Sequence, residues 1–223
     1  MTIRTNDAQG RAASISKNRI GAFLAATALT GSLMGLPAYG ANLLVAPGAT
    51  QTDDTGQSYD GIIVGGGGGT GTATYNVTTT DGVTAGQSGV TIGANSAGEV
   101  NVTSGGLLIT SRDLPFVPSH VYVGKGTSNG TLNISGADMN GTQLSTVQID
   151  GDLRIANDSA NADVTVENGG QLNVGATITV GNTDNYTGTL NIDKDGLVEA
   201  DNVTIAAAGY VSKGWISVHD GGE

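Results

Sequence analysis

The sequence has no cysteine, two histidines and only 4% aromatic residues in a chain of 223 residues. The lack of Cys excludes disulfide scaffolds, thiol catalysis and Cys-based zinc sites. His120 and His219 alone leave little imidazole for catalysis or metal binding. Basic residues are also scarce, because 9 Lys and Arg stand against 20 Asp and Glu and give a formal net charge of -11. Such a chain lacks the basic surface that nucleic-acid phosphates require, so we expect no nucleic-acid partner.

The first forty residues carry the pattern of an export signal. An extended basic lead with four Lys and Arg precedes an uncharged, mostly apolar stretch, 20–36, and the small residues of 38–40 (AYG) follow it. This order predicts a secretory signal peptide, 1–40, that is cleaved after Gly40. The alternative is a membrane-spanning helix, but the stretch of 17 residues is diluted with Gly, Ala, Ser and Thr and is too short to span comfortably.

Export makes the protein more acidic. Residues 1–40 hold four bases and one acid, so residues 41–223 keep five bases and nineteen acids, a net charge of -14. No later stretch approaches the roughly 18 apolar residues of a spanning helix. We therefore expect no membrane insertion by this chain itself.

Short triplets with apolar outer residues recur along the chain, and in most of them the middle residue is polar. A first set ends before Gly or Ala and repeats every 25 to 32 residues: 62–65 (IIVG), 90–93 (VTIG), 121–124 (VYVG), 153–156 (LRIA), 178–181 (ITVG) and 203–206 (VTIA). A second set has Asn or Thr in the middle: 75–77 (YNV), 100–102 (VNV), 132–134 (LNI), 164–166 (VTV) and 190–192 (LNI). A third set follows Gly turns: 83–85 (VTA), 107–109 (LLI), 172–174 (LNV) and 197–199 (LVE).

This period-two pattern is typical of strands with one buried face. A single triplet buries too little to offset the backbone entropy of ordering it, whereas stacked copies share one apolar column and pair their backbones in parallel. We therefore predict an all-β protein, a parallel β-helix (β-solenoid) of about six coils with three short strands per coil. An antiparallel sandwich also has short, regularly spaced strands, but the repetition of a three-strand unit favours the solenoid.

The repeats also predict the boundaries of the chain's parts. Residues 41–61 form an N-terminal lead-in or cap, residues 62–212 the β-helix repeats, and residues 213–223 a C-terminal tail or the start of a truncated coil. Gly pairs such as Gly105-Gly106 and Gly169-Gly170 are expected at the corners, where a positive φ lets each coil bend.

The middle residues of the second triplets predict a ladder of amide side chains. If these triplets stack in register, four asparagines lie on one outer face: Asn76, Asn101, Asn133 and Asn191. Amide ladders of this kind reinforce in-register stacks.

The sequence offers little for catalysis or metal binding. The segment 86–89 (GQSG) only faintly resembles a serine nucleophile loop and lacks the acid that usually precedes the Ser. Paired acids occur at three places: Asp53 and Asp54, Asp150 and Asp152, and Asp193 and Asp195. Such pairs serve glycoside hydrolases or Ca²⁺ sites, but these occupy different places in the repeat. We expect solvated turn acids, no catalytic residue, no cofactor and no metal site, with weak Ca²⁺ binding at the surface as the alternative.

One insertion, 110–120 (TSRDLPFVPSH), stands out from the repeats because it holds both Pro residues of that region. Loops that project from a rigid solenoid often carry recognition. Arg112, Phe116 and His120 therefore form a candidate interaction loop, and a lengthened turn without a function is the alternative.

Units such as 180–200 (VGNTDNYTGTLNIDKDGLVEA) and 123–139 (VGKGTSNGTLNISGADM), preceded by a signal, resemble the passenger region of Gram-negative autotransporter (type V secreted) proteins. The resemblance covers roughly 62–212. It implies a right-handed β-helix, export by the secretion machinery with periplasmic chaperones, and display at the cell surface or release outside the cell. It also implies an adhesin or similar virulence factor that contacts molecules on host or neighbouring cells. The C-terminal β-barrel of that family has no counterpart here, which suggests a truncated passenger, an interrupted gene or a stand-alone secreted relative.

We therefore expect an exported passenger segment that acts in adhesion or cell-surface interaction without catalysis. A carbohydrate-active β-helix enzyme that uses surface acids is the alternative from another class. A truncated fragment without an independent function is the third.

Overall fold

The computed structural model describes residues 41–111, 118–158, 160–181, 186–206 and 213–223. Over these residues every named element is a β-strand. None of the described segments is a helix of the length and apolarity needed to cross a membrane. The predicted signal peptide, 1–40, and two residues of the predicted interaction loop, Arg112 and Phe116, lie outside the described residues.

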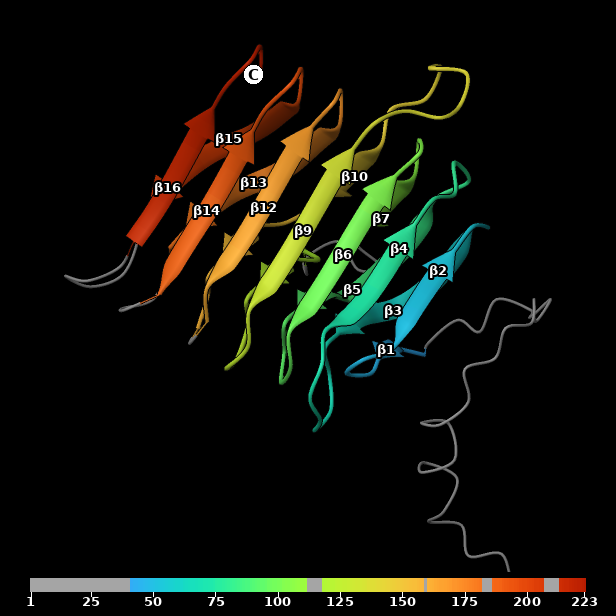
Figure 1. The fold of residues 1–223 in the computed structure, drawn as a ribbon, viewed down its shortest axis with the longest axis vertical. Helices are drawn as coiled ribbons and strands as arrows, with labels where there is room; N and C mark the ends of the chain where they lie inside the picture. Colours follow the sequence, from blue (N-terminus) through green and yellow to red (C-terminus); the bar gives the residue numbers. More distant parts are fainter. Residues whose placement is uncertain (1–40, 112–117, 159, 182–185, 207–212) are drawn as a thin grey trace, which may run out of the picture. The chain divides into compact units, whose positions relative to one another are not determined.

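The strands form the stacked coils of a parallel β-helix, which confirms the predicted fold class. Along the chain, each coil contributes a strand to a first, a second and a third face in turn, and every pairing between named strands is parallel. The second face is a seven-stranded sheet, seen side by side in Figure 1. Its spatial order is β16 (Lys213–Val218), β14 (Thr187–Ile192), β12 (Ala162–Glu167), β9 (Gly130–Ser135), β6 (Gly98–Thr103), β4 (Ala73–Val77) and β2 (Thr50–Asp53).

The first and third faces belong to one continuous sheet because four long strands bend from one face to the other. These strands are β3 (Gln57–Val64), β5 (Val83–Ile92), β13 (Gln171–Val180) and β15 (Leu197–Ile205). The first face also holds β1 (Leu43–Val45), β8 (Val121–Val123) and β11 (Leu153–Ile155), and the third face holds β7 (Leu107–Thr110) and β10 (Thr146–Ile149). The register shifts in the pairing of β3 with β5 and of β13 with β15 mark the bends.

The predicted first and second triplets lie in register throughout the stack. The leading residues of the first triplets form one row, namely Ile62, Val90, Val121, Leu153, Ile178 and Val203. Those of the second triplets form another, namely Tyr75, Val100, Leu132, Val164 and Leu190. In both sets, the same positions of the triplet therefore point inward in every coil.

The third face corrects two of the predicted triplets. Leu108 pairs with Val83 and with Val147, so the inward residues of β7 are Leu108 and Thr110, and Leu107 and Ile109 face outward. In β15, likewise, the register places the inward residues one position later than the triplet 197–199 implies. The run Leu107-Leu108-Ile109 is apolar at three successive positions, so its composition does not reveal which residues point inward. The pairing of β10, which follows the long turn 136–145, was not predicted at all.

The core is a column of inward Val, Ile, Leu and Ala side chains. Ile92, Leu132, Ile155 and Val180, from four different coils, are fully buried. Because β-branched side chains fit a pleated, stacked surface, the same residue types recur at each level. Burial of this continuous column is the main term that stabilises coils too small to fold singly.

The corner glycines serve two different needs. Gly105 has φ +79°, as expected for a tight bend. Gly106 does not have a positive φ, but a Cβ there would lie 2.2 Å from the carbonyl oxygen of Val77 in the preceding coil. The second glycine of the pair is therefore required by close approach of two coils and not by its backbone conformation.

A polar cluster closes the N-terminal end of the column. The carboxylate of Asp53, which is 6% exposed, accepts hydrogen bonds from the hydroxyls of Tyr59 at 2.8 Å and Tyr75 at 2.7 Å. The amide of Gln51 donates to its other oxygen at 3.0 Å. Burial, followed by the charge of Asp53, raises the pKa of both tyrosines above their ordinary range, so both remain protonated donors.

The stack extends beyond the predicted repeat range at both ends. β1 and β2 lie within the predicted lead-in 41–61 and pair in register with β3 and β4. β16 lies within 213–223 and pairs with β14. Both flanking segments thus contribute strands to the stack.

Candidate functional site

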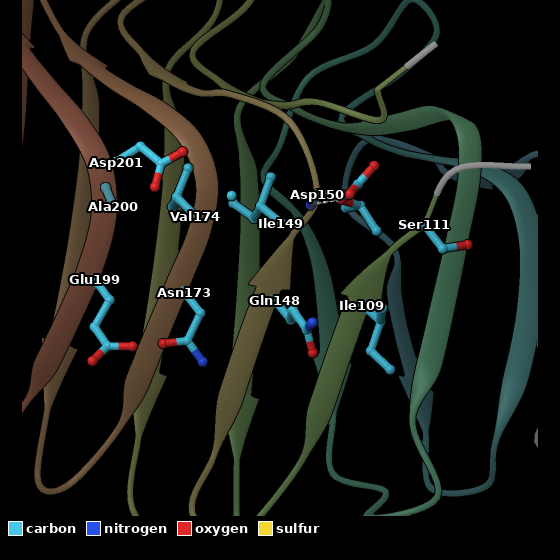
Figure 2. Close-up of a pocket in the computed structure, with 12 residues that line it drawn as sticks. Ile109, Ser111, Gln148, Ile149, Asp150, Asn173, Val174, Glu199, Ala200 and Asp201 are labelled. Carbon is cyan, nitrogen blue, oxygen red and sulfur yellow. Dashed lines mark hydrogen bonds between the residues drawn. The ribbon is translucent and has the colours of Figure 1, made fainter. Parts of the chain in front are cut away.

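The third face of the stack carries a shallow hollow. Its volume is about 510 Å³, and strands β7, β10, β13 and β15 and the residues that follow them line it. Figure 2 shows its lining side chains on neighbouring strands. We call this surface the third-face groove and define it by its lining residues: Ile109, Thr110, Ser111, Gln148, Ile149, Asp150, Asn173, Val174, Gly175, Glu199, Ala200 and Asp201.

The outward positions of the four strands supply one row of the groove. Ile109 pairs with Gln148, Gln148 with Asn173, and Asn173 with Glu199. Neighbouring strands lie about 4.8 Å apart, so these four side chains repeat at that spacing across the stack. Figure 2 shows them side by side on the same face.

A second row lies two residues further along each chain, where the chain bends towards the first face. It consists of Ser111, Asp150, Gly175 and Asp201. Gly175 has no side chain, so the row opens between Asp150 and Asp201. The two carboxylates belong to coils two strand spacings apart, which places their strands about 9.5 Å from each other.

A small buried network positions Asp150. The hydroxyl of Thr110, an inward residue 2% exposed, accepts the backbone N–H of Asp150 at 3.1 Å and donates to the carbonyl of Ser119 at 3.3 Å. The buried hydroxyl of Ser119 in turn donates to the carbonyl of Gly86 at 2.6 Å. Thr110 interrupts the apolar column, and its hydrogen bonds fix the bend that carries Asp150 into the groove.

The charge of the groove is negative. Asp150, Glu199 and Asp201 line it, and Lys, Arg and His are absent from its lining within the part of the chain that the structure describes. The side chains of Gln148, Asn173, Glu199 and Asp201 make no hydrogen bond or ion pair with other described residues. Their donors and acceptors are therefore open to a bound molecule.

The predicted amide ladder on the second face behaves differently. Asn133 donates to the side-chain oxygen of Asn101 at 2.8 Å, Asn101 donates to that of Asn76 at 3.1 Å, and Asn76 donates to the hydroxyl of Thr52 at 3.3 Å. Asn191 lies on the same row but pairs with Thr165, which stands between it and Asn133. These amides satisfy one another, so this face has less free hydrogen-bonding capacity than the third-face groove.

His120 lies outside the groove, on the outer side of the first face. Its Nδ1 accepts the backbone N–H of Asp152 at 2.9 Å, and its ring meets that of Tyr122 edge-on at 6.1 Å between centroids. Lys125 and Arg154 also lie over Tyr122, with the Lys125 Nζ 4.1 Å from the ring centroid. Burial lowers the pKa of His120, against the opposing charge of Asp152, so its neutral form is favoured.

The structure separates the paired acids of the sequence. Asp150 lines the groove, while Asp152 accepts a hydrogen bond from Arg154 at 3.0 Å on the first face. Asp53 closes the N-terminal end. Asp193 and Asp195 occupy the turn after β14. No group of three or more His, Asp and Glu side chains suited to hold a metal ion occurs among the described residues.

Sequence reasoning missed four of the polar residues of the groove: Gln148, Asn173, Glu199 and Asp201. A signal was present, because three of them occupy the outward position of a third-face strand, in the segments VQI, LNV and VEA. Aligning those segments so that their inward residues coincide would have placed Gln148, Asn173 and Glu199 in one row.

Comparison with known proteins identifies no relative. No known protein family, no curated protein and no solved structure matches this chain significantly.

Proposed function

We propose that this chain is an exported, autotransporter-like passenger segment that acts in adhesion or cell-surface interaction, and that it does so by binding and without catalysis. The observation that carries the proposal is the row of polar side chains, Gln148, Asn173 and Glu199, that three successive coils present to the third-face groove. A row that repeats at the strand spacing favours an extended partner that can contact several coils at once.

The chemistry of the lining favours a particular kind of partner. Two amides, Gln148 and Asn173, offer both donors and acceptors, and the carboxylates of Asp150, Glu199 and Asp201 offer acceptors. The concentration of negative charge disfavours anionic polymers. A neutral or cationic extended molecule on the surface of a host or neighbouring cell fits this lining best.

Binding by residues 41–223 to whole cells and to arrayed surface glycans and peptides tests this proposal. The variant Gln148→Ala/Asn173→Ala/Glu199→Ala removes the polar row, and we expect at least a tenfold loss of affinity, about 1.4 kcal/mol. The matched control, Thr91→Ala/Thr179→Ala, removes outward polar residues of the first face and should bind as the unaltered protein does. Equal loss in both variants, or no loss in the first, would refute the groove as the binding surface.

Export is tested separately. If residues 1–40 are a signal peptide, the protein recovered outside the cytoplasm begins at Ala41. Recovery of the uncleaved chain from the cytoplasm alone would argue against an exported passenger.

A carbohydrate-active enzyme is the second candidate, and one observation favours it. Asp150 and Asp201 line the same groove, and their strands lie about 9.5 Å apart. The two carboxylates of inverting glycosidases lie about 6.5 to 9.5 Å apart. Asp201 is exposed, however, and a general acid usually needs burial to hold its proton near neutral pH. Release of reducing ends from a polysaccharide, abolished by both Asp150→Asn and Asp201→Asn, would support the enzyme over the binding protein.

A further inference from the structure

A cluster of basic and aromatic side chains lies on the outer side of the first face, at strands β8 and β11. We call it the Tyr122 cluster and define it by five residues: His120, Tyr122, Lys125, Asp152 and Arg154. The Nζ of Lys125 lies 4.1 Å from the centroid of the Tyr122 ring, and the guanidinium carbon of Arg154 lies 5.6 Å from the same centroid. Lys125 and Arg154 are two of the four Lys and Arg residues that the structure describes. Positive charge, which is scarce in this acidic chain, is thus concentrated at one place.

Both cations keep free hydrogen-bonding capacity. Apart from its contact with the Tyr122 ring, the ammonium group of Lys125 makes no hydrogen bond or ion pair with any described residue. Arg154 donates from Nη2 to Oδ2 of Asp152 at 3.0 Å, and its side chain is partly exposed. A guanidinium presents several N–H donors in a rigid fork, so donors of Arg154 remain open to a ligand.

The sheet and a set of side-chain contacts hold the cluster in place. β8 pairs with β5 on one edge and with β11 on the other, and Tyr122 and Arg154 are directly opposite residues of β8 and β11. The ring of His120 meets that of Tyr122 edge-on, and its Nδ1 accepts the backbone N–H of Asp152. A ligand would therefore meet side chains that are already ordered, which lowers the entropic cost of binding.

The charge of the cluster matches an oxyanion that carries one negative charge. Lys125 and Arg154 contribute two positive charges, and Asp152 contributes one negative charge. Burial lowers the pKa of His120, so its neutral form is favoured. One carboxylate or sulfate group balances this arrangement, and a guanidinium fork matches such a group in a bidentate geometry. A phosphate monoester, with about -1.5 to -2 charges at pH 7, would leave excess negative charge beside Asp152.

The surroundings of the cluster favour a saccharide over a peptide. Peptides commonly bind a sheet by adding a strand to an open edge or by placing side chains in apolar pockets. β8 has a partner strand on both edges, and none of the exposed large apolar side chains of the described residues belongs to the cluster. A saccharide requires neither feature, because its hydroxyl and acidic groups bind through hydrogen bonds and charge.

We propose that the Tyr122 cluster binds the carboxylate or sulfate group of an acidic saccharide, with the guanidinium of Arg154 and the ammonium of Lys125 as the hydrogen-bond donors. The ring of Tyr122 stabilises both cations next to each other. The overall acidity of the chain does not prevent this contact, because salt screens exposed charges beyond about 8 Å at physiological ionic strength. The site lies on a different face from the third-face groove, takes anions that the groove disfavours, and does not depend on the function proposed for the groove.

Calorimetric titration of the protein with defined oligosaccharides tests the proposal. The acidic probes are an oligogalacturonate, which carries carboxylates, and a sulfated oligosaccharide, and the neutral probe is a maltooligosaccharide of equal length. We expect binding of at least one acidic probe, weaker binding as salt rises, and no binding of the neutral probe. Comparison of the two acidic probes decides whether the preferred group is a carboxylate or a sulfate.

The variant Lys125→Ala/Arg154→Ala should lower the affinity for the acidic probe at least about tenfold, because it removes both donors. Its matched control, Lys194→Ala/Lys213→Ala, removes the same charge elsewhere and should bind with nearly the affinity of the unaltered protein. The triple alanine variant of the groove should also bind the acidic probe normally. This proposal and the function proposed for the groove therefore fail independently of each other.

A second variant keeps the proposal testable if the loss of Arg154 disturbs the fold around Asp152. Lys125→Glu reverses a charge whose ammonium group has no hydrogen bond to lose, so the circular dichroism spectrum should stay unchanged while binding of the acidic probe is lost. Lys213→Glu is the matched control and should bind normally.

Two results would overturn the proposal outright: no binding of either acidic probe, or an equal loss of affinity in Lys125→Ala/Arg154→Ala and Lys194→Ala/Lys213→Ala. A poly-glutamate peptide of equal charge is the last probe. Weaker binding of this peptide than of the acidic saccharide supports the proposal. Binding of equal strength would assign the cluster to acidic proteins and overturn the saccharide.

Discussion

The polar cluster at the N-terminal end provides the sharpest test of how the column is closed. In Asp53→Ala, the hydroxyls of Tyr59 and Tyr75 lose their acceptor, and that of Tyr75 is fully buried. A hydrogen bond to a charged group is worth about 1.5 to 3 kcal/mol, and a buried donor without a partner costs about 1 to 3 kcal/mol. We expect Asp53→Ala to lower the free energy of unfolding by about 3 to 5 kcal/mol, a large part of the 5 to 15 kcal/mol that is typical of a domain.

Urea unfolding followed by far-UV circular dichroism measures this loss. The double variant Asp53→Ala/Tyr75→Phe removes the orphaned donor as well, so it should recover about 1 to 3 kcal/mol relative to Asp53→Ala. A loss below about 1 kcal/mol for Asp53→Ala, or strictly additive effects in the cycle, would contradict the reasoning.

The same cluster predicts a loss of stability in alkali. The folded state keeps Tyr75 protonated, because its pKa is raised, while the unfolded chain releases this proton above its ordinary pKa of 10.0. The folded state then binds more protons, so the free energy of unfolding falls as pH rises above about 10, by up to about 1.4 kcal/mol per pH unit from this residue. Tyr75→Phe should remove that part of the slope. An unchanged slope would show that the hydroxyl is not held in the protonated form.

Three further perturbations test the core, a corner and the first face. Ile134→Asp should unfold the neighbouring coils, because it places an unpaired charge at a fully buried position. Asn133→Asp, on the outer side of the same strand, should cost only about 1 to 3 kcal/mol of stability. Thermal unfolding followed by circular dichroism compares the two variants. Gly106→Ala should lower the thermal midpoint, since its Cβ would lie 2.2 Å from a carbonyl oxygen of the preceding coil, and an unchanged midpoint would mean that the coils can separate there. Because the pKa of His120 is lowered in the folded protein, the unfolded chain takes up a proton first as pH falls through about 6.5, so the free energy of unfolding in urea titrations should decline there. Protonation would break the hydrogen bond from the backbone N–H of Asp152 to Nδ1. His120→Gln should flatten the decline.

The repeat made most of the fold predictable because each coil restates the same local rule. The alternation in 121–123 (VYV) and 132–134 (LNI) specifies which residues face inward, and the recurrence of such segments along the chain favours their stacking. The third face was harder to predict. In Leu107-Leu108-Ile109 both sides of the strand are apolar, so only pairing with β5 and β10 decides that Leu108 is the inward residue.

The groove required information that no single segment contains. Asp150 and Asp201 lie 51 residues apart in the sequence and line one groove because β10, β13 and β15 stack in register. The bend that carries Asp150 there depends on Thr110, a polar residue inside the column, bonded to the backbone of two other segments. Contacts of this kind arise between coils and leave no signature in the spacing of the residues that make them.

The sequence by itself thus determined the class of fold, the register of two of the three faces and the residue types of the core, because period-two alternation within a repeat is a local property. The tertiary structure alone decided which residues of the third-face strands point inward, the alignment of the outward polar side chains into a groove, and the contrast between the two ends of the column. Asp53 closes one end by hydrogen bonds to Tyr59 and Tyr75, while Val203 and Ile205 remain exposed at the other. These features depend on which coils lie next to each other, and the pairing of strands between coils decides that.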